Sequence, residues 1–185
     1  MLITPSQLEN EPLPIAVAFA PGSIDFTTGI TQLGPLPVKG QADLLVEHRG
    51  GSDQIADIRV RATYAGDFEM ECARCVEPVA MPLKGEFDLI FRPQEADADA
   101  GERAITVDET EIGYYEQNGL LLEDVVREQV LLSLPGRVLC RSDCKGLCMR
   151  CGQDLNQALC SCEDTPADPR WSALAGLADK LELKH

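Results

Sequence analysis

The spacing of the cysteines constrains this chain more than any other feature of its sequence. All eight cysteines among the 185 residues fall into close groups. The groups are a C-x2-C pair at Cys72 and Cys75, a C-x3-C-x3-C-x2-C run at Cys140, Cys144, Cys148 and Cys151, and a C-x-C pair at Cys160 and Cys162. Cysteines that only fill a hydrophobic core would be scattered, so this grouping indicates metal ligands or reactive thiols.

The most specific unit is Cys148-Met149-Arg150-Cys151-Gly152, which the C-x-C pair follows after eight residues. A C-x2-C turn directs two sulfurs to one point, and a glycine after it can adopt the positive φ that turns backbone N–H groups toward them. Four thiolates at the corners of a tetrahedron are the ligands of a structural zinc ion. The spacing matches neither ferredoxin pattern, and no βαβ pattern accompanies the pairs as in thioredoxin-type sites. We therefore predict a Zn²⁺-binding knuckle over residues 136–165.

The sequence leaves the choice of zinc ligands open. Our first choice is Cys148, Cys151, Cys160 and Cys162. Cys144 is a competing ligand for either member of the last pair. A second site would consist of Cys72, Cys75, Cys140 and Cys144, provided that the fold brings them together. The alternative for Cys72 and Cys75 is a reduced pair at the tip of a hairpin.

Apolar and polar residues alternate in several stretches of the first two-thirds of the chain. This pattern predicts half-buried antiparallel strands at residues 38–47, 55–64, 68–72 and 83–91. We expect residues 50–53 to turn the first of these strands into the second, and residues 65–67 to form another turn. The predicted fold class is α+β, with an antiparallel sheet of about five strands that is open or barrel-like. This β-rich body spans residues 36–135, and residues 1–35 form a partly ordered N-terminal extension.

Two stretches have the period of a helix rather than a strand. Residues 120–134 carry a broad apolar stripe, with Glu123 and Asp124 in the first turn and Pro135 after the last. They predict a core helix packed on the sheet, with a partner-binding helix as the alternative. Near the C-terminus, Asp168 suits an N-cap and Pro169 the first helical position, which predicts a helix within residues 166–185. That helix docks on the body or is displayed to a partner.

Charge is distributed unevenly along the chain. The formal net charge is −15, the opposite of the balance expected for a general nucleic-acid binder. Residues 94–111 have a net charge of −6, and we expect an acidic, solvated loop over residues 92–104. An acidic arm that holds a basic protein is the alternative for this stretch. The cysteine region is locally basic, because residues 137–150 contain Arg137, Arg141, Lys145 and Arg150 against one acid.

No pattern in the sequence indicates catalysis or a membrane. His48 and His185 have no recognisable partner, and no nucleotide-binding or nucleophile-elbow motif is present. A shell made only of cysteines is closed and structural, so we predict that the chain is not an enzyme and has no small-molecule substrate. No apolar run approaches the ~18 residues of a membrane span. The apolar patch at residues 13–20 follows Glu9 and Glu11 rather than basic residues, so we expect a cytoplasmic protein.

The order of these features resembles one family. The resemblance is carried by Cys72-Ala-Arg-Cys75-Val-Glu-Pro78, by the helical stretch that ends at Pro135, by residues 140–156 with the C-K-G-L-C-x-x-C-G-x-x-L-N pattern, by Cys160-Ser-Cys162, and by Asp168-Pro-Arg-Trp-Ser-Ala-Leu174. Residues 36–181 are similar to the YceD family, the large ribosomal RNA subunit accumulation proteins of bacteria and plastids. The resemblance implies a role in accumulation, processing or assembly of large-subunit ribosomal RNA, and it carries over no catalytic residue.

Two hypotheses for the partner follow from the resemblance and the charge. In the first, Arg137, Arg141, Lys145 and Arg150 contact large-subunit precursor rRNA or a pre-ribosomal particle. The same side chains also offset the negative charge of a tetrathiolate zinc site, which is the alternative explanation for them. In the second hypothesis, the acidic chain holds or chaperones a basic ribosomal protein without direct contact with RNA.

Overall fold

A computed structural model describes residues 1–50, 53–97, 112–116 and 118–162 of the chain. The strands are β1 (Leu2–Ile3), β2 (Leu13–Phe19), β3 (Ile30–Gln32), β4 (Leu36–Gly50), β5 (Asp53–Glu71), β6 (Pro78–Pro93), β7 (Ile112–Tyr115) and β8 (Leu120–Leu121). The helices are α1 (Pro5–Leu8), the 3₁₀ turn η1 (Gln94–Asp97) and α2 (Leu122–Ser133). The described part is therefore mostly sheet with few helices, in agreement with an α+β protein.

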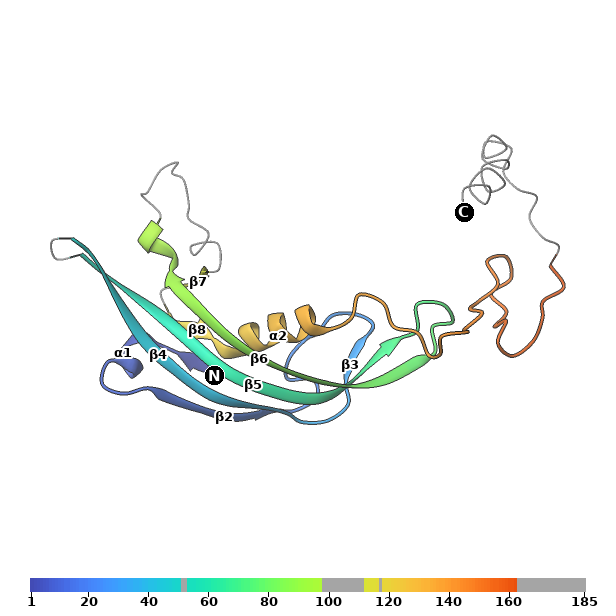
Figure 1. Ribbon diagram of the computed structural model, residues 1–185, viewed down its shortest axis with the longest axis horizontal. Helices are drawn as coiled ribbons and strands as arrows, with labels where there is room; N and C mark the ends of the chain where they lie inside the picture. The colour runs from blue at the N-terminus through green and yellow to red at the C-terminus, as the bar shows by residue number, and fades with distance from the viewer. Residues whose placement is uncertain (51–52, 98–111, 117, 163–185) are drawn as a thin grey trace, which may run out of the picture.

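The main sheet is long, curved and open. Its strands lie in the order β2-β4-β5-β6-β7, with β3 paired to β5. All of its pairs are antiparallel except β6–β7, which is parallel. Within the described residues β2 and β7 lie at the two edges and do not pair with each other, so the barrel-like alternative is wrong (Figure 1).

Alternation along the strands sorts side chains onto the two faces of the sheet. In β5, Ile58, Val60 and Tyr64 are buried, whereas Arg61 and Thr63 between them are exposed. Paired residues on neighbouring strands face the same side of the sheet. Val38 of β4, for example, pairs with Tyr64 of β5, and both are buried. One face therefore carries the hydrophobic core, and the other carries polar and charged residues.

The turn predicted at residues 65–67 is not present. The β5 strand runs through this point to Glu71, since Gly66 pairs with Leu83 and Asp67 with Pro82 in the ladder with β6. Gly66 marks a close approach rather than a turn, because a side chain there would meet Leu36 at 3.0 Å. The hairpin predicted at residues 50–53 does connect β4 to β5, and Gly50 pairs with Asp53.

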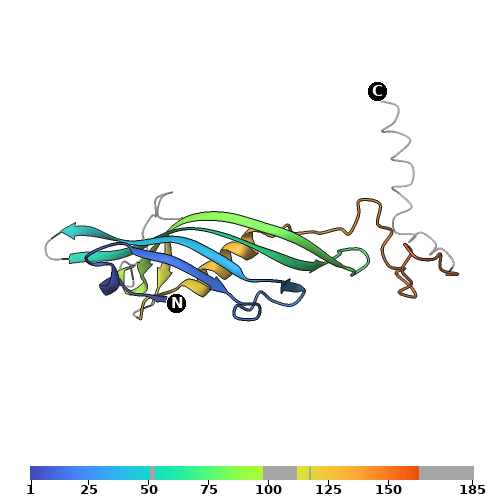
Figure 2. The same cartoon turned by 90° about the horizontal axis from the view of Figure 1, so that it is seen from below.

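Helix α2 covers the core face of the sheet (Figures 1 and 2). It buries Leu122, Val125, Val126 and Val130, as the apolar stripe of the sequence predicts. The hydroxyl of Tyr64 in β5 donates to the carbonyl oxygen of Gln129 at 3.0 Å, which attaches the helix to the strand. The helix begins at Leu122 rather than residue 120 because the two preceding residues form β8, which pairs with β1.

Residues 1–35 pack as part of this body, where we expected an extension. They form β1, α1, β2 and β3, and Ile3, Ile15 and Phe26 are buried in the core. Phe26 contacts Phe68 of β5 edge to face, with ring centroids 5.2 Å apart. Hydrophobic burial of this kind stabilises the sheet along its β2 edge.

The first residues of the predicted acidic loop form regular structure, since β6 continues to Pro93 and η1 follows it. Arg92 belongs to β6 and is buried, where its guanidinium donates to both carboxylate oxygens of Asp57 at 3.1 and 2.8 Å. A buried charge requires such a partner, so this residue is structural. Residues 98–111 lie outside the described residues, as does the helix predicted within residues 166–185.

Candidate metal centre

The eight cysteines gather at one end of the sheet, two of them in the turn that joins β5 to β6 and six in the segment that follows α2. They form two groups of four, and within each group the four Sγ atoms lie within 4.8 Å of one another. The first group is Cys72, Cys75, Cys140 and Cys144, and the second is Cys148, Cys151, Cys160 and Cys162. Each group could hold one metal ion.

The first group joins two parts of the chain that are distant in sequence. Cys72 and Cys75 lie in the turn between β5 and β6, and the segment after α2 brings Cys140 and Cys144 to them. The Sγ atoms of Cys72 and Cys144 are 3.9 Å apart, and those of Cys75 and Cys140 are 3.6 Å apart. Four thiolates about 2.3 Å from a tetrahedral zinc ion lie about 3.8 Å from one another, so these distances fit such an ion.

A tight turn presents the first pair of sulfurs. The N–H of Val76 donates to the carbonyl oxygen of Cys72 at 2.9 Å, and Val76 has a φ of 64°, a conformation that is strained for a β-branched residue. The N–H of Cys140 donates to the sulfur of Cys72 at 3.4 Å. This hydrogen bond and others from backbone N–H groups lower the pKa of Cys72 to about 6.

The neighbouring thiol behaves in the opposite way. The N–H of Glu77 favours a thiolate at Cys75, but burial and the thiol of Cys72 outweigh it and raise the pKa of Cys75 to about 12. Several thiolates packed this closely repel one another, and a cation at their centre would remove that repulsion. The first group therefore has the chemistry of a metal site as well as the distances.

The second group is built within a single short segment. Gly152 has a φ of 74°, as the sequence predicts for the residue after a C-x2-C turn, and its N–H donates to the carbonyl oxygen of Cys148 at 2.9 Å. The Sγ atoms of Cys148 and Cys160 are 3.5 Å apart. Backbone N–H groups, first that of Cys151, lower the pKa of Cys148 to about 6. The thiol of Cys151 and burial raise the pKa of Cys162 to about 12.

Asn156 connects the two groups. Its side-chain N–H donates to the sulfur of Cys144 in the first group at 3.4 Å, and its Oδ1 accepts from the N–H of Lys145 at 2.7 Å. Leu147 and Asp154 also form a β-bridge that closes the turn containing Cys148 and Cys151. Asn156 thus fixes the orientation of one group from a position within the other.

Arg74 attaches this region to the β5–β6 turn. Its Nη1 donates to the carbonyl oxygen of Cys144 at 2.6 Å, and its own carbonyl accepts from the N–H of Leu147 at 2.9 Å. Gly146 lies against it with a φ of 77°, and a Cβ there would be 2.8 Å from the carbonyl oxygen of Arg74. Only glycine fits this position, which explains the C-K-G-L-C pattern.

Of the site residues predicted from the sequence, the cysteines lie in the two groups and the basic residues lie on the surface. Cys144, the competing ligand, lies with the first group and not the second. The four basic residues of the segment are all exposed around the cysteines, and the guanidinium of Arg141 pairs with Asp143 at 3.4 Å. Sequence reasoning missed Arg74 and Asn156. The sequence offered one indication for each of them: Arg74 lies inside the first C-x2-C pair, and Asn156 ends the Leu155-Asn156 dipeptide.

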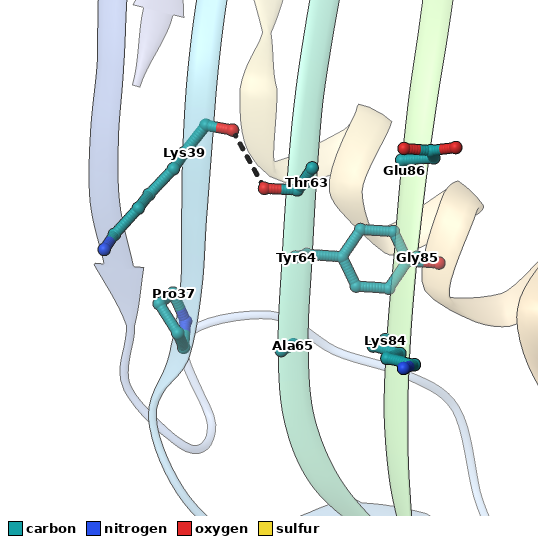
Figure 3. A pocket seen from close by; sticks show the side chains of 8 residues that line it. All are labelled: Pro37, Lys39, Thr63, Tyr64, Ala65, Lys84, Gly85 and Glu86. Atoms are coloured by element: carbon teal, nitrogen blue, oxygen red, sulfur yellow. Dashed lines mark hydrogen bonds between the residues drawn. The ribbon is translucent and has the colours of Figure 1, made fainter.

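A shallow hollow elsewhere on the molecule lies on the polar face of the sheet. It has a volume of about 530 Å³ and is lined by residues of β4, β5 and β6, including Lys39, Thr63, Lys84 and Glu86 (Figure 3). The charges are mixed, and no cysteine or histidine lines it. The hollow therefore adds no cysteine or histidine ligand to those of the cysteine groups. Among the described residues no helix is long and apolar enough to cross a membrane.

The fold and the two groups define a class of protein: an open-sheet protein with paired tetracysteine centres that could hold metal. Residues 60–178 match the large ribosomal RNA subunit accumulation protein YceD family, and the chain belongs to this family. The family is described by an accumulation role rather than by a reaction, in agreement with a protein that is not an enzyme.

Individual relatives extend this match. An uncharacterized protein of Mycobacterium bovis is 32% identical over 117 residues, which cover 63% of this chain and 54% of the relative. A protein of Mycobacterium leprae is 29% identical over 122 residues, covering 65% of this chain and 53% of the relative. The chain thus spans about half the length of these relatives. A chloroplastic YCED homolog of Arabidopsis thaliana, named as a large ribosomal RNA subunit accumulation protein, is 32% identical over 60 residues, covering 32% of this chain and 19% of the homolog. No solved structure matches the chain.

Proposed function

We propose that this chain is a non-catalytic factor that supports accumulation, processing or assembly of large-subunit ribosomal RNA. In this proposal two structural zinc ions hold its cysteine end together, and the basic surface of that end contacts precursor RNA. The observation that carries the proposal is the exposure of Arg137, Arg141, Lys145 and Arg150 around the two cysteine groups of a chain whose net charge is −15.

Zinc is the metal that the donor set favours. Each group offers four thiols and no carboxylate, and soft thiolate ligands in a tetrahedron select zinc or iron–sulfur clusters rather than magnesium or calcium. The backbone N–H groups that donate to the sulfurs of Cys72 and Cys148 stabilise the thiolate form that a metal requires. Free thiols persist in reducing compartments, which supports a cytoplasmic location.

Contact with RNA is supported by the position of the basic side chains. RNA binding draws on Lys and Arg side chains that reach phosphate oxygens, and these need to be exposed. The acidic remainder of the chain would repel RNA, which would restrict contact to this end. A tetrathiolate zinc site carries about two net negative charges, so part of the basic charge also offsets the metal sites.

Cross-linking in growing cells tests the proposal. The tagged protein is irradiated with ultraviolet light, and any attached RNA is sequenced. We expect reads that focus on one region of the large-subunit precursor. Recovery of a basic ribosomal protein in stoichiometric amount, with no RNA above background, would contradict direct contact and favour the protein-chaperone alternative.

Salt dependence with purified protein and single-stranded RNA separates RNA contact from charge compensation. The logarithm of the affinity should fall with the logarithm of the salt concentration, with a slope of about −0.7 for each phosphate neutralised. Replacing Arg141 and Lys145 together by glutamine should flatten the slope. The matched control replaces Lys39 and Lys84, which line the hollow on the polar face of the sheet, and should leave it unchanged.

A further inference from the structure

A second hollow is lined by residues of β7, β8 and the start of α2. These elements lie at the opposite end of the sheet from the segment after α2 that carries most of the cysteines (Figure 1). The volume of the hollow is about 450 Å³. Three large apolar side chains line it and are strongly exposed: Leu2 by 45%, Tyr114 by 54% and Leu121 by 41%. Apolar side chains gathered at a concave site, with polar residues at the rim, are typical of a protein interaction surface. We call this hollow the Leu121 groove.

The rim of the Leu121 groove is acidic. Glu116, Asp124 and Glu128 line it, and none of its described lining residues is basic. In the part of the chain that the structure describes, these three carboxylates have no hydrogen-bond or ion-pair partner. Arg127 of α2 is not among the described residues that line the groove, and its guanidinium donates to the carbonyl oxygen of Asp25.

The fold accounts for only one of these three carboxylates. Asp124 lies in the first turn of α2, where a carboxylate stabilises the helix dipole. Glu128 lies one turn further, at the i+4 position from Asp124, where two like charges destabilise a helix. Glu116 comes from a different element, the bridge with Gly119. A cation held between these carboxylates would relieve their repulsion.

We propose that the Leu121 groove binds a basic peptide segment of a partner protein. An apolar side chain of the segment enters the hollow against Leu121 and Tyr114, and lysine or arginine side chains beside it pair with Glu116 and Glu128. RNA is disfavoured because the same carboxylates repel phosphate. A second copy of this chain is disfavoured because its net charge is −15. The site goes beyond the proposed function, since it lies at the other end of the sheet from the cysteine groups.

The test measures binding of two fluorescein-labelled peptides to the full chain by anisotropy at low salt. One peptide has lysines and arginines interspersed with leucines, and the other has the same charges with serine in place of leucine. We expect the leucine peptide to bind more tightly. The double variant E116Q/E128Q should weaken its binding about fivefold to tenfold, because each exposed ion pair contributes a factor of up to about five. Added salt should reduce that difference.

Matched variants make the test specific to the groove. D67N/E86Q removes two exposed carboxylates elsewhere on the sheet and should leave the affinity within about twofold. Leu121→Ala should weaken the leucine peptide about fivefold but leave the serine peptide unchanged, whereas Val46→Ala, at a side chain that is 47% exposed on β4, should affect neither. Circular dichroism establishes that each variant is folded.

Three outcomes would overturn the proposal. The first is equal affinity for the two peptides, which would mean that charge alone attracts them. The second is an equal loss of affinity in E116Q/E128Q and in D67N/E86Q. The third is a dimer in analytical ultracentrifugation that Leu121→Ala dissociates, which would assign the groove to self-association. None of these outcomes depends on RNA or on zinc, so failure here leaves the proposed function untouched.

Discussion

The two cysteine groups contain the same four thiols but are built in different ways. In the first group, Cys75 and Cys140 are 65 positions apart, and the β5–β6 turn and the segment after α2 bring their sulfurs together. Three of its four cysteines are buried. The second group closes within residues 148–162, and its cysteines are exposed or half-buried. One group therefore depends on the tertiary fold, and the other depends mainly on local turns.

This difference predicts different roles for the two proposed zinc ions. Metal binding supplies folding free energy to the segment that its ligands enclose. A metal in the first group would tie the β5–β6 turn to the segment after α2 and fix the whole cysteine end on the sheet. A metal in the second group would order only the knuckle around it.

The largest expected effect comes from Cys144→Ser. Loss of this ligand should remove one of two bound zinc ions, and it should also detach the cysteine segment from the β5–β6 turn. Hydrogen exchange should then show lost protection both at the turn of residues 72–77 and throughout residues 138–156. Elemental analysis measures the zinc. Protection loss confined to residues 148–162 would contradict the bridging role of the first group.

Cys151→Ser should have a smaller effect on the fold. It also removes one zinc ion, but hydrogen-exchange protection should fall only within residues 147–162, and the melting temperature of the sheet should stay at that of the parent chain. Cys144→Ser and Cys151→Ser make the same chemical change, one thiol to one hydroxyl, so a difference between them reflects the position of the cysteine. Equal destabilisation of the sheet by the two variants would refute the distinction between the groups.

Alkylation of the metal-free protein at two pH values compares how accessible the sulfurs of Cys72 and Cys148 are to a reagent. The pKa values of Cys72 and Cys148 are both lowered to about 6, so each is mainly thiolate at pH 7 and mainly thiol at pH 5. Iodoacetamide should label Cys148 first, about tenfold more slowly at pH 5 than at pH 7, because only the thiolate reacts. Cys72 should label later despite its similar pKa, since it is 1% exposed. Mass spectrometry of peptides reads out the order, and prior labelling of Cys72 would contradict the structure.

Asn156→Ala should have the smallest effect and shows whether the groups are coupled. The substitution removes the hydrogen bonds to the sulfur of Cys144 and to the N–H of Lys145. Loss of such a partner lowers metal affinity about tenfold. The metal affinity of the first group should fall, although Asn156 lies in the chain segment that forms the second group. Competition with a zinc chelator measures both affinities, and Gln157→Ala, an exposed neighbour, serves as the control.

Local patterns predicted much of the fold and part of the site. Alternation identified the strands around Val60 and Phe87, and a 3.6-residue stripe identified the helix that buries Val126. These predictions succeed because burial on one face repeats along the element itself. The pattern misled at Gly66, because a glycine that turns a chain and a glycine that allows close packing look alike in sequence.

The sequence by itself determined that the cysteines form close pairs, that Gly152 follows one pair with a positive φ, and that basic residues surround them. These are properties of a few consecutive residues. Only the tertiary structure decided that Cys144 lies with Cys72, that residues 1–35 complete the core, and that the sheet stays open. Each of these depends on contacts between distant parts of the chain. Such contacts follow from the packing of whole elements, for which no single segment carries the information.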